Sequence, residues 1–255
     1  MIRVCGLSVT AVKGTRLRAV DSVELDAAGA VGNREFFVID AVDRMVNAKQ
    51  LGELQTVVAT YDGSGLTLEF PDGEVVSAHV AYDDAVEARF LSRVVSGRLV
   101  RGPWAQALSE HVGQPVRLAQ ADGSVDRGER GAVSLISRAS LERLASAAGV
   151  EEVDPRRFRM LVEIDGVSAH EEDQWVGSCA LIGSALVRWG GHVGRCLITS
   201  RDPESGVIDL PTLDVLRDYR GSAPTTEALP FGIYGEVLEP GRVRVGDAVE
   251  LVSAT

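Results

Sequence analysis

The first candidate for chemistry in this sequence is Cys196, within the stretch GHVGRCLITSRDPESG over residues 191–206. It follows a glycine-containing loop and stands directly after Arg195, whose guanidinium would favour a thiolate over a thiol. A thiolate can bind a soft metal or attack an electrophile. The same pattern also fits a small side chain that fills the space behind a turn. The residues alone therefore leave both interpretations open.

The other cysteines and the histidines give weaker signals. We interpret Cys5 and Cys179, which lie in apolar segments, as small buried hydrophobic residues. Three cysteines without a C-x-x-C pair predict no disulfide framework, zinc site or iron–sulfur cluster. The histidines have no metal-ligand spacing, so we expect structural or surface roles, with His192 alone close to Cys196 in sequence. They are His79, His111, His170 and His192.

Composition limits the classes of function. With 255 residues, 45% hydrophobic and 25% charged, the chain suits one large or two small soluble domains. A net charge of -11 argues against nucleic-acid and membrane-surface partners, which are anionic themselves. We find no secretory signal and no apolar run near 18 residues, and expect a cytoplasmic protein with reduced thiols. The common nucleotide-binding, hydrolase and metalloprotease motifs are absent from the sequence.

Short strands are predicted for most of the first hundred residues. Segments rich in Val, Leu, Phe and Thr alternate with Gly, Asp and Asn over residues 1–12, 34–40, 56–62, 65–80 and 85–91. Residues 71–73, Pro-Asp-Gly, predict a hairpin turn. Residues 102–113 read GPWAQALSEHVG and predict the first helix, which we expect to separate this β-rich half from the rest.

The second half mixes both kinds of element. Helices are predicted over 137–149, with Gly149 closing the first, and over 210–221. Strands are predicted over 157–165, RFRMLVEID, and on both sides of Gly183 within 179–189. This order predicts an α+β, β-rich fold with barrel-like sheets and a few short helices.

Several segments together resemble the MOSC domain. They are GRCLITSRDPESG, PFGIYGEVLEPGRVRVGDAVEL, RFRMLVEID and DQWVGSCALIGSALVRW. Upstream, LSVTAVKG, GNREFFVID and DRMVNAKQLGEL resemble the N-terminal β-barrel domain of the mitochondrial amidoxime-reducing component and its bacterial relatives. The resemblance covers nearly the whole chain in order. It implies two barrel-like β domains, a MOSC N-terminal β-barrel over 1–105 and a MOSC domain over 106–255, with a cofactor in the cleft between them.

The resemblance also implies a set of site residues. Cys196 stands in the place of the family cysteine that ligates molybdenum, so it is the implied metal ligand and catalytic residue. The cofactor would be Mo-molybdopterin, whose phosphate suits converging Arg and Lys side chains. Without the resemblance, Arg34 and Arg159 would be interpreted as members of surface ion pairs. The implied cofactor-binding residues are Lys13, Gly14, Arg34, Gly131, Arg159, Gly194, Arg195 and Tyr234.

One departure from the family lies beside this set. Met160 and Leu161 follow the Arg-Phe-Arg segment where many members have a small residue or Pro and then Asn. The missing Asn would remove a polar contact near the cofactor.

The implied activity is that of a molybdenum-cofactor oxidoreductase. It would reduce small N-hydroxylated substrates with electrons from a separate ferredoxin- or cytochrome-type protein and its reductase. The basic segments 154–159 and 195–201 are the candidate docking points for that partner. One alternative is a sulfur carrier with a Cys196 persulfide, which requires only an exposed thiol. Another is a non-catalytic cofactor-binding module, which allows molybdenum without turnover.

Overall fold

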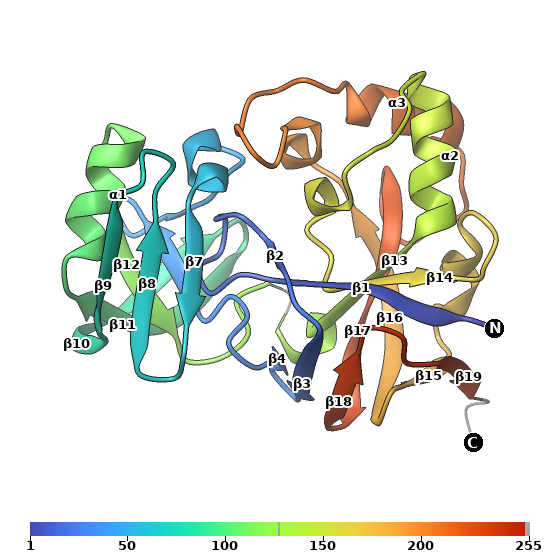
Figure 1. The fold of residues 1–255 in the computed structure, drawn as a ribbon, viewed down its shortest axis with the longest axis horizontal. Helices are drawn as coiled ribbons and strands as arrows, with labels where there is room; N and C mark the ends of the chain where they lie inside the picture. The colour runs from blue at the N-terminus through green and yellow to red at the C-terminus, as the bar shows by residue number, and fades with distance from the viewer. Residues whose placement is uncertain (127, 253–255) are drawn as a thin grey trace.

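The predicted strands assemble into sheets that form two lobes lying side by side (Figure 1). The computed structural model describes residues 1–126 and 128–252. We call the lobe that contains both chain ends in Figure 1 the right lobe and the other the left lobe.

An eight-stranded sheet forms the centre of the right lobe. Its neighbours pair antiparallel except β13 and β14, which are parallel. The N-terminal strand belongs to this sheet, because Arg3 pairs with Asp165 and Leu7 with Val162. In spatial order the strands are β19 (Val249–Val252), β15 (Cys179–Ile182), β16 (Ala185–Gly194), β17 (Pro230–Glu239), β13 (Val133–Ser137), β14 (Val162–Asp165), β1 (Arg3–Val9) and β2 (Arg18–Ala19).

The left lobe combines a five-stranded and a three-stranded sheet. The larger contains β10 (Ala81–Phe90), β11 (Arg93–Arg101), β12 (Arg117–Ala121), β5 (Phe36–Ile39) and β6 (Met45–Val46). The smaller contains β7 (Val58–Tyr61), β8 (Gly65–Glu69) and β9 (Val75–His79). A further small sheet, of β18 (Gly241–Arg244), β3 (Ser22–Asp26) and β4 (Gly29–Ala30), packs with the right lobe.

The helices are short. The α-helices are α1 (Trp104–Val112), α2 (Arg138–Ala148) and α3 (Thr212–Arg220). Among the described residues, five 3-10 helices lie in connections, namely η1 (Gly52–Thr56), η2 (Glu129–Gly131), η3 (Pro155–Phe158), η4 (Glu171–Trp175) and η5 (Leu197–Ser200). None of the helices in the part of the chain that the structure describes has the length and apolarity to cross a membrane.

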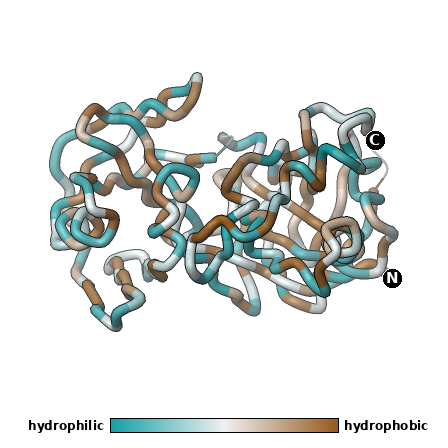
Figure 2. The backbone as a smooth tube through the Cα atoms, turned by 90° about the horizontal axis from the view of Figure 1, so that it is seen from above, coloured by the Kyte–Doolittle hydropathy of each residue, from teal (hydrophilic) through white to brown (hydrophobic). Residues whose placement is uncertain are grey.

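Each lobe has its own apolar core. Phe36, Leu66 and Trp104 meet inside the left lobe, whereas Leu7 and Trp189 meet inside the right lobe. Alternate residues of β3 are buried and exposed, as a strand with one core-facing side requires. Hydrophobic stretches accordingly run through the interior of both lobes (Figure 2).

The expected fold class is confirmed, since strands dominate and the helices are few and short. The hairpin at residues 71–73 connects β8 to β9, and Gly73 has the positive φ of 92° that this turn needs. The helix expected over 137–149 is α2, where the Ser137 side chain accepts from the backbone N–H of Ser140 and Gly149 ends the helix at φ 69°.

Helix α1 does not separate the two halves of the chain. Trp104 and Leu108 are fully buried in the left core, and the indole Nε1 donates to the Leu66 carbonyl at 3.0 Å. Strand β12, farther along the chain, also pairs in the left lobe, whereas β1 lies in the right. The domain division near residue 105 stays a prediction.

The prediction of a strand over 157–165 is wrong for its first half. Residues 155–158 form η3, and Arg159 takes the left-handed conformation at φ 56°, so the strand starts only at Val162. The sequence here is apolar, as in a buried strand, because Phe158 and Met160 are both buried. Their burial comes from the core around α2 and α3 rather than from sheet pairing.

Candidate functional site

A cavity of about 650 Å³ opens between the lobes, and both lobes contribute to its lining. Lys13 and Phe90 come from the left side, and Phe158 and Cys196 from the right side. Of the implied site residues, Gly194 alone is not part of the lining. Those that line the cavity are Lys13, Gly14, Arg34, Gly131, Arg159, Arg195, Cys196 and Tyr234. The structure thus brings them together, and their binding roles stay predictions.

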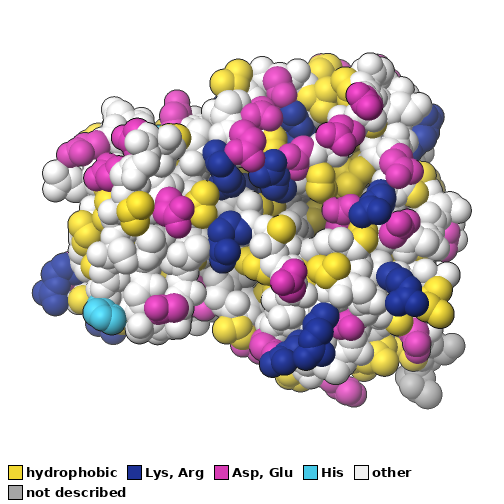
Figure 3. Space-filling model, viewed as in Figure 1, with side chains coloured by type: hydrophobic (Ala, Val, Ile, Leu, Met, Phe, Trp, Pro, Cys, Tyr) yellow, Lys and Arg dark blue, Asp and Glu magenta, His cyan; other side chains and the backbone are white. Residues whose placement is uncertain are grey.

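The cavity is cationic on an acidic protein. Its lining carries two carboxylates, Asp126 and Glu227, in a chain of net charge -11. The cationic lining residues are Lys13, Arg34, Arg93, Arg130, Arg159 and Arg195. Figure 3 shows Lys and Arg side chains gathered beside the hollow between the lobes. Such a surface concentrates anionic ligands.

Three of these cations form a cluster around one carboxylate. The Asp126 carboxylate accepts from Lys13 Nζ and from Arg34 Nη1. Arg34 Nη2 donates to the carbonyl of Arg159 at 2.5 Å, and Arg159 Nη2 donates to the carbonyl of Thr15 at 2.8 Å. We call Lys13, Arg34 and Arg159 the cation cluster.

Backbone conformation directs two members of the cluster. Arg34 and Arg159 both have φ 56°, in the left-handed region that non-glycine residues rarely adopt. Arg34 is fixed there by its N–H, which donates to the Thr10 carbonyl at 2.6 Å. Residues held in such conformations concentrate at functional sites, where surrounding structure determines them.

The directions of the pKa shifts in the cluster are those expected where cations outnumber carboxylates. Burial, together with the charge of Arg34, lowers the pKa of Arg159 to about 9. Burial also lowers the pKa of Lys13, although Asp126 opposes this. Burial by itself would raise the pKa of Asp126, but the charges of Arg34 and Lys13 outweigh it and hold this pKa well below its ordinary value. One carboxylate therefore serves three cations, and an anion in the cavity would stabilise them.

Arg34 also has an unused donor. Its Nε is buried and has no hydrogen-bond partner among the described residues. A buried donor without a partner is costly unless a ligand or water satisfies it. The site therefore fits a ligand with anionic oxygen atoms.

Cys196 lies at the wall opposite the left lobe, at the start of η5. Its carbonyl accepts from the Thr199 N–H at 3.1 Å and from Thr199 Oγ1 at 3.0 Å, which fixes the backbone at the cysteine. Cys196 is exposed, whereas Cys5 and Cys179 are only partly buried, less than we expected. Burial, with Glu163 nearby, raises the pKa of Cys5 to about 12, so that thiol is kept protonated.

The sequence places Arg195 next to Cys196, but in the structure its guanidinium binds backbone carbonyls. Its Nε donates to the Phe231 carbonyl at 2.8 Å, and its Nη1 donates to the Phe158 carbonyl at 2.8 Å. The guanidinium also lies 5.2 Å from the centroid of the Phe158 ring. Arg195 thus links the cavity-lining Phe158 to β17 through backbone carbonyls.

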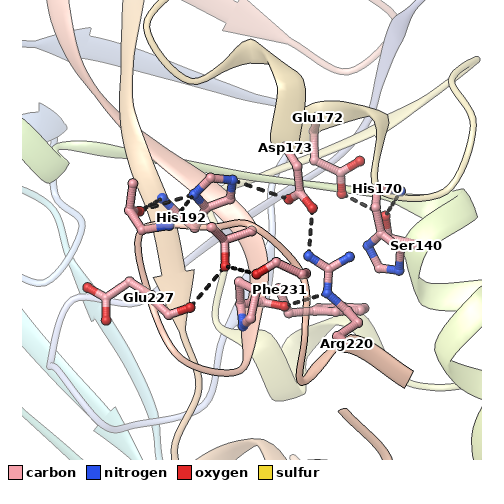
Figure 4. A network of polar contacts seen from close by, with 12 residues as sticks. Ser140, His170, Glu172, Asp173, His192, Arg220, Glu227 and Phe231 are labelled. Carbon is pink, nitrogen blue, oxygen red and sulfur yellow. Dashed lines mark hydrogen bonds and ion pairs between the residues drawn. The ribbon is translucent and has the colours of Figure 1, made fainter. Parts of the chain in front are cut away.

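A polar network supports the cavity wall from behind (Figure 4). The Nδ1 of His192 accepts from the Thr226 N–H at 3.2 Å, and its Nε2 lies 3.9 Å from Asp173 Oδ1. Asp173 also accepts from Arg220 at 2.6 Å, and Arg220 Nε donates to the Pro230 carbonyl at 2.9 Å. His192 is 5% exposed, and its structural role stays a prediction. The network holds residues 226–231, which include the cavity-lining Glu227.

A loop connects the lobes beside the cavity. Glu204 pairs with Arg16 of the left side at 2.6 Å and with Arg156 at 2.5 Å. Arg201 Nη1 donates to the Gly206 carbonyl at 2.6 Å. We call residues 201–206 the bridging loop.

The basic segment 154–159 is largely charge-compensated. Arg156 pairs with Asp154 and Glu204, and Arg157 pairs with Asp209 through two contacts of 2.6 Å. This segment therefore offers a docking partner less positive charge than its sequence indicates.

Sequence reasoning missed several cavity residues. Asp126 stands in an irregular Gly- and Ser-containing stretch, GSVDRGER, that gives no sign of its contacts with Lys13 and Arg34. Phe90, Leu91 and Arg93 belong to a hairpin whose position over the cavity depends on the packing of the lobe.

The sequence matches two known domain families over most of its length. Residues 1–115 match the MOSC N-terminal beta barrel domain, and residues 122–250 match the MOSC domain. The chain therefore belongs to the MOSC family.

Relatives that cover most of the chain have modest identity. Mitochondrial amidoxime-reducing component 1 of Xenopus laevis is 26% identical, over 97% of this chain and 81% of the relative. Mitochondrial amidoxime reducing component 2 of Bos taurus is 28% identical, over 93% and 80%. Among solved structures, the YUAD protein of Bacillus subtilis is 15% identical and covers 100% of this chain and 98% of its own, with a TM-score of 0.48.

Proposed function

We propose that this chain holds a molybdenum–pterin cofactor in the cavity between its lobes and reduces small N-hydroxylated compounds. The observation that carries this proposal is that the cation cluster and the exposed thiol of Cys196 line the same cavity. MOSC domains are associated with molybdenum cofactors, and the relatives above are named for amidoxime reduction.

The residues present fit such a cofactor. The pterin phosphate is an anion, which suits three cations of which two contact one carboxylate, and it suits the unpaired Nε of Arg34. Molybdenum prefers sulfur donors, and Cys196 supplies a thiol at the other wall. The apolar Met160 lines the cavity where many family members have a small residue or Pro.

Each part of the site has a separate task. When bound, the cofactor supplies two-electron chemistry in which an N-hydroxyl oxygen leaves as water, with two protons taken up. Lys13, Arg34 and Arg159 bind the cofactor phosphate, and Asp126 holds the first two in place. Cys196 offers its sulfur to the metal. Electrons come from a separate ferredoxin- or cytochrome-type protein and its reductase, and a cytoplasmic location stays a prediction.

The sulfur-carrier alternative has weaker support. An exposed Cys196 suits a persulfide, but that function gives no reason for three cations around one carboxylate. A non-catalytic binding module would use the same cluster, and turnover alone distinguishes it from the reductase.

The test is metal content and turnover in protein produced by a host that synthesises the cofactor. We expect about one molybdenum per chain and reduction of hydroxylamine with an artificial low-potential donor. Cys196→Ala should abolish turnover because it removes the proposed metal ligand. Cys179→Ala is the matched control, since Cys179 lies in β15 and outside the cavity lining, and should keep full activity. Wild-type protein without molybdenum, or an active Cys196→Ala variant, would contradict the proposal.

A further inference from the structure

The tip of the β10–β11 hairpin has an unusual residue at the cavity. Phe90 pairs with Arg93, so Leu91 and Ser92 form a two-residue turn. Leu91 has φ 57°, at the first central position, where such turns favour glycine. A β-carbon there costs conformational energy that glycine avoids.

Leu91 is also exposed to an unusual degree. Its exposed fraction is 87%, the highest for a large apolar residue in the described part of the chain apart from Met1. Neither local backbone preference nor the apolar core therefore explains a leucine here. Of the six non-glycine residues with positive φ among those described, three line the cavity, namely Arg34, Leu91 and Arg159. An outlier of this kind indicates a functional contact.

The hairpin is tied to the cation cluster. Arg93 Nη2 donates to the backbone carbonyl of Asp126, whose carboxylate holds Lys13 and Arg34. The Phe90 ring lies near two cations, with Lys13 Nζ 5.1 Å and the Arg93 guanidinium 5.6 Å from its centroid. These contacts fix the tip at the cavity and leave the Leu91 side chain exposed there.

The cavity lining also has an apolar part. Phe90 and Leu91 contribute to it from the left lobe, and Val193 and Ile198 from the right. Val193 and Ile198 stand three residues before and two after Cys196 in the sequence. The cavity therefore has two different parts. The cations suit an anionic group, and the apolar wall suits a hydrocarbon group.

We propose that Leu91, supported by Phe90, is a specificity-determining residue that contacts the apolar body of the substrate. The inference rests on the proposed function and assigns the substrate class as N-hydroxylated compounds with an aryl or alkyl group. The reaction is R–NHOH plus two electrons and two protons to R–NH₂ plus water. Leu91 contacts the R group and takes no part in the electron or proton transfer.

The experiment compares substrates that differ only in R. Hydroxylamine, N-methylhydroxylamine and N-benzylhydroxylamine are reduced with an artificial low-potential donor by wild-type, Leu91→Gly and Leu91→Asn protein. Glycine and asparagine both tolerate the turn conformation, so folding is preserved. Val94→Ser is the matched control, because Val94 is 60% exposed on the same hairpin and outside the cavity lining.

We expect both Leu91 variants to lose about tenfold in kcat/KM for N-benzylhydroxylamine, the scale of a lost apolar contact in a pocket. The rate with hydroxylamine should stay within twofold, the melting temperature of Leu91→Gly should be unchanged or higher, and Val94→Ser should match wild type. Equal losses on all substrates, or no loss, would overturn the inference. A loss seen only with a protein electron donor would also overturn it, since Leu91 would then contact the donor.

A second measurement separates this inference from the proposed function. N-benzylhydroxylamine is titrated into cofactor-loaded wild-type and Leu91→Gly protein by calorimetry. If no N-hydroxylated compound is reduced, the proposed function has failed, and the titration alone decides the role of Leu91. About tenfold weaker binding to the variant supports the contact, and equal binding rejects it.

Discussion

At the scale of single residues, Asp126 explains how like charges coexist beside the cavity. Lys13 and Arg34 would repel each other without the carboxylate that both contact. Because one carboxylate faces three cations, and only Lys13 and Arg34 contact it directly, the cluster keeps an excess of positive charge. Asp126 thus reduces the repulsion within the cation cluster in the folded protein, and the remaining positive charge still attracts an anion.

Asp126→Asn tests this role through stability. We expect the variant to lose about 2 kcal/mol of unfolding free energy at pH 7, because it leaves adjacent cations without a counter-charge while the site keeps some solvent contact. The pKa of Asp126 is lowered in the folded state, so its stabilisation is fully present above its ordinary value of 3.8, declines as pH falls below that value, and is lost completely only below the much lower folded-state pKa. Urea denaturation at pH 7 and pH 3 measures both effects.

The control for this prediction is Asp122→Asn. Asp122 is a neighbouring, exposed carboxylate that does not line the large cavity. Its substitution should change stability by less than about 0.5 kcal/mol. A similar loss in both variants would show that general surface charge, rather than the cluster, determines the effect.

At the scale of elements, the bridging loop depends on two glycines. Gly206 has φ 71°, and a Cβ there would overlap the carbonyl oxygen of Gly52 in η1. A Cβ on Gly52 would in turn overlap the Arg201 guanidinium. A Cβ fits at neither position, so glycine at both positions allows the loop and η1 to approach closely.

Gly206→Ala should therefore destabilise the protein by about 3 kcal/mol, from backbone strain together with overpacking. Gly177→Ala is the matched variant, because Gly177 also has positive φ, 93°, but has open space around its Cβ position. It should lose only about 1 kcal/mol. Thermal and urea denaturation compare the two variants. Equal losses of stability would mean that the close approach to Gly52 adds no destabilisation.

At the scale of the whole molecule, electron supply is the open requirement of the proposed reaction. The sequence has no dinucleotide-binding fingerprint and no cysteine pattern for an iron–sulfur cluster. Cofactor-loaded protein should therefore not reduce hydroxylamine with NADH or NADPH alone, and should do so with an artificial low-potential donor. Single-turnover assays with each donor measure this, and rapid turnover with NADPH alone would contradict it.

Ionic strength distinguishes how a protein donor binds. Redox carriers are often acidic, and a net charge of -11 would repel them except at a local basic surface. Added salt should slow the partner-driven rate and leave the artificial-donor rate unchanged. The pairing of Arg156 and Arg157 with carboxylates makes segment 154–159 a weaker docking candidate than its sequence indicates.

The sequence by itself determined the local elements and singled out Cys196 as the candidate cysteine. The β8–β9 hairpin, the ends of α2 at Ser137 and Gly149, and the strands on either side of Gly183 all follow from short-range patterns. Turn chemistry and capping act over a few residues, so they can be recognised in a single sequence. Cys196 stood out for the same reason, because its glycine-rich and basic neighbours are adjacent in the chain.

Only the tertiary structure decided how the site is assembled. Asp126 lies 113 residues from Lys13 and 92 from Arg34, and no local pattern encodes contacts over such separations. The left-handed conformation of Arg159 likewise broke a stretch whose apolar residues predicted an unbroken strand. Long-range packing overrides local propensity where a buried charge needs a counter-charge or hydrogen-bond partner. Such partners come from distant parts of the chain, so only the assembled lobes show which residues they are.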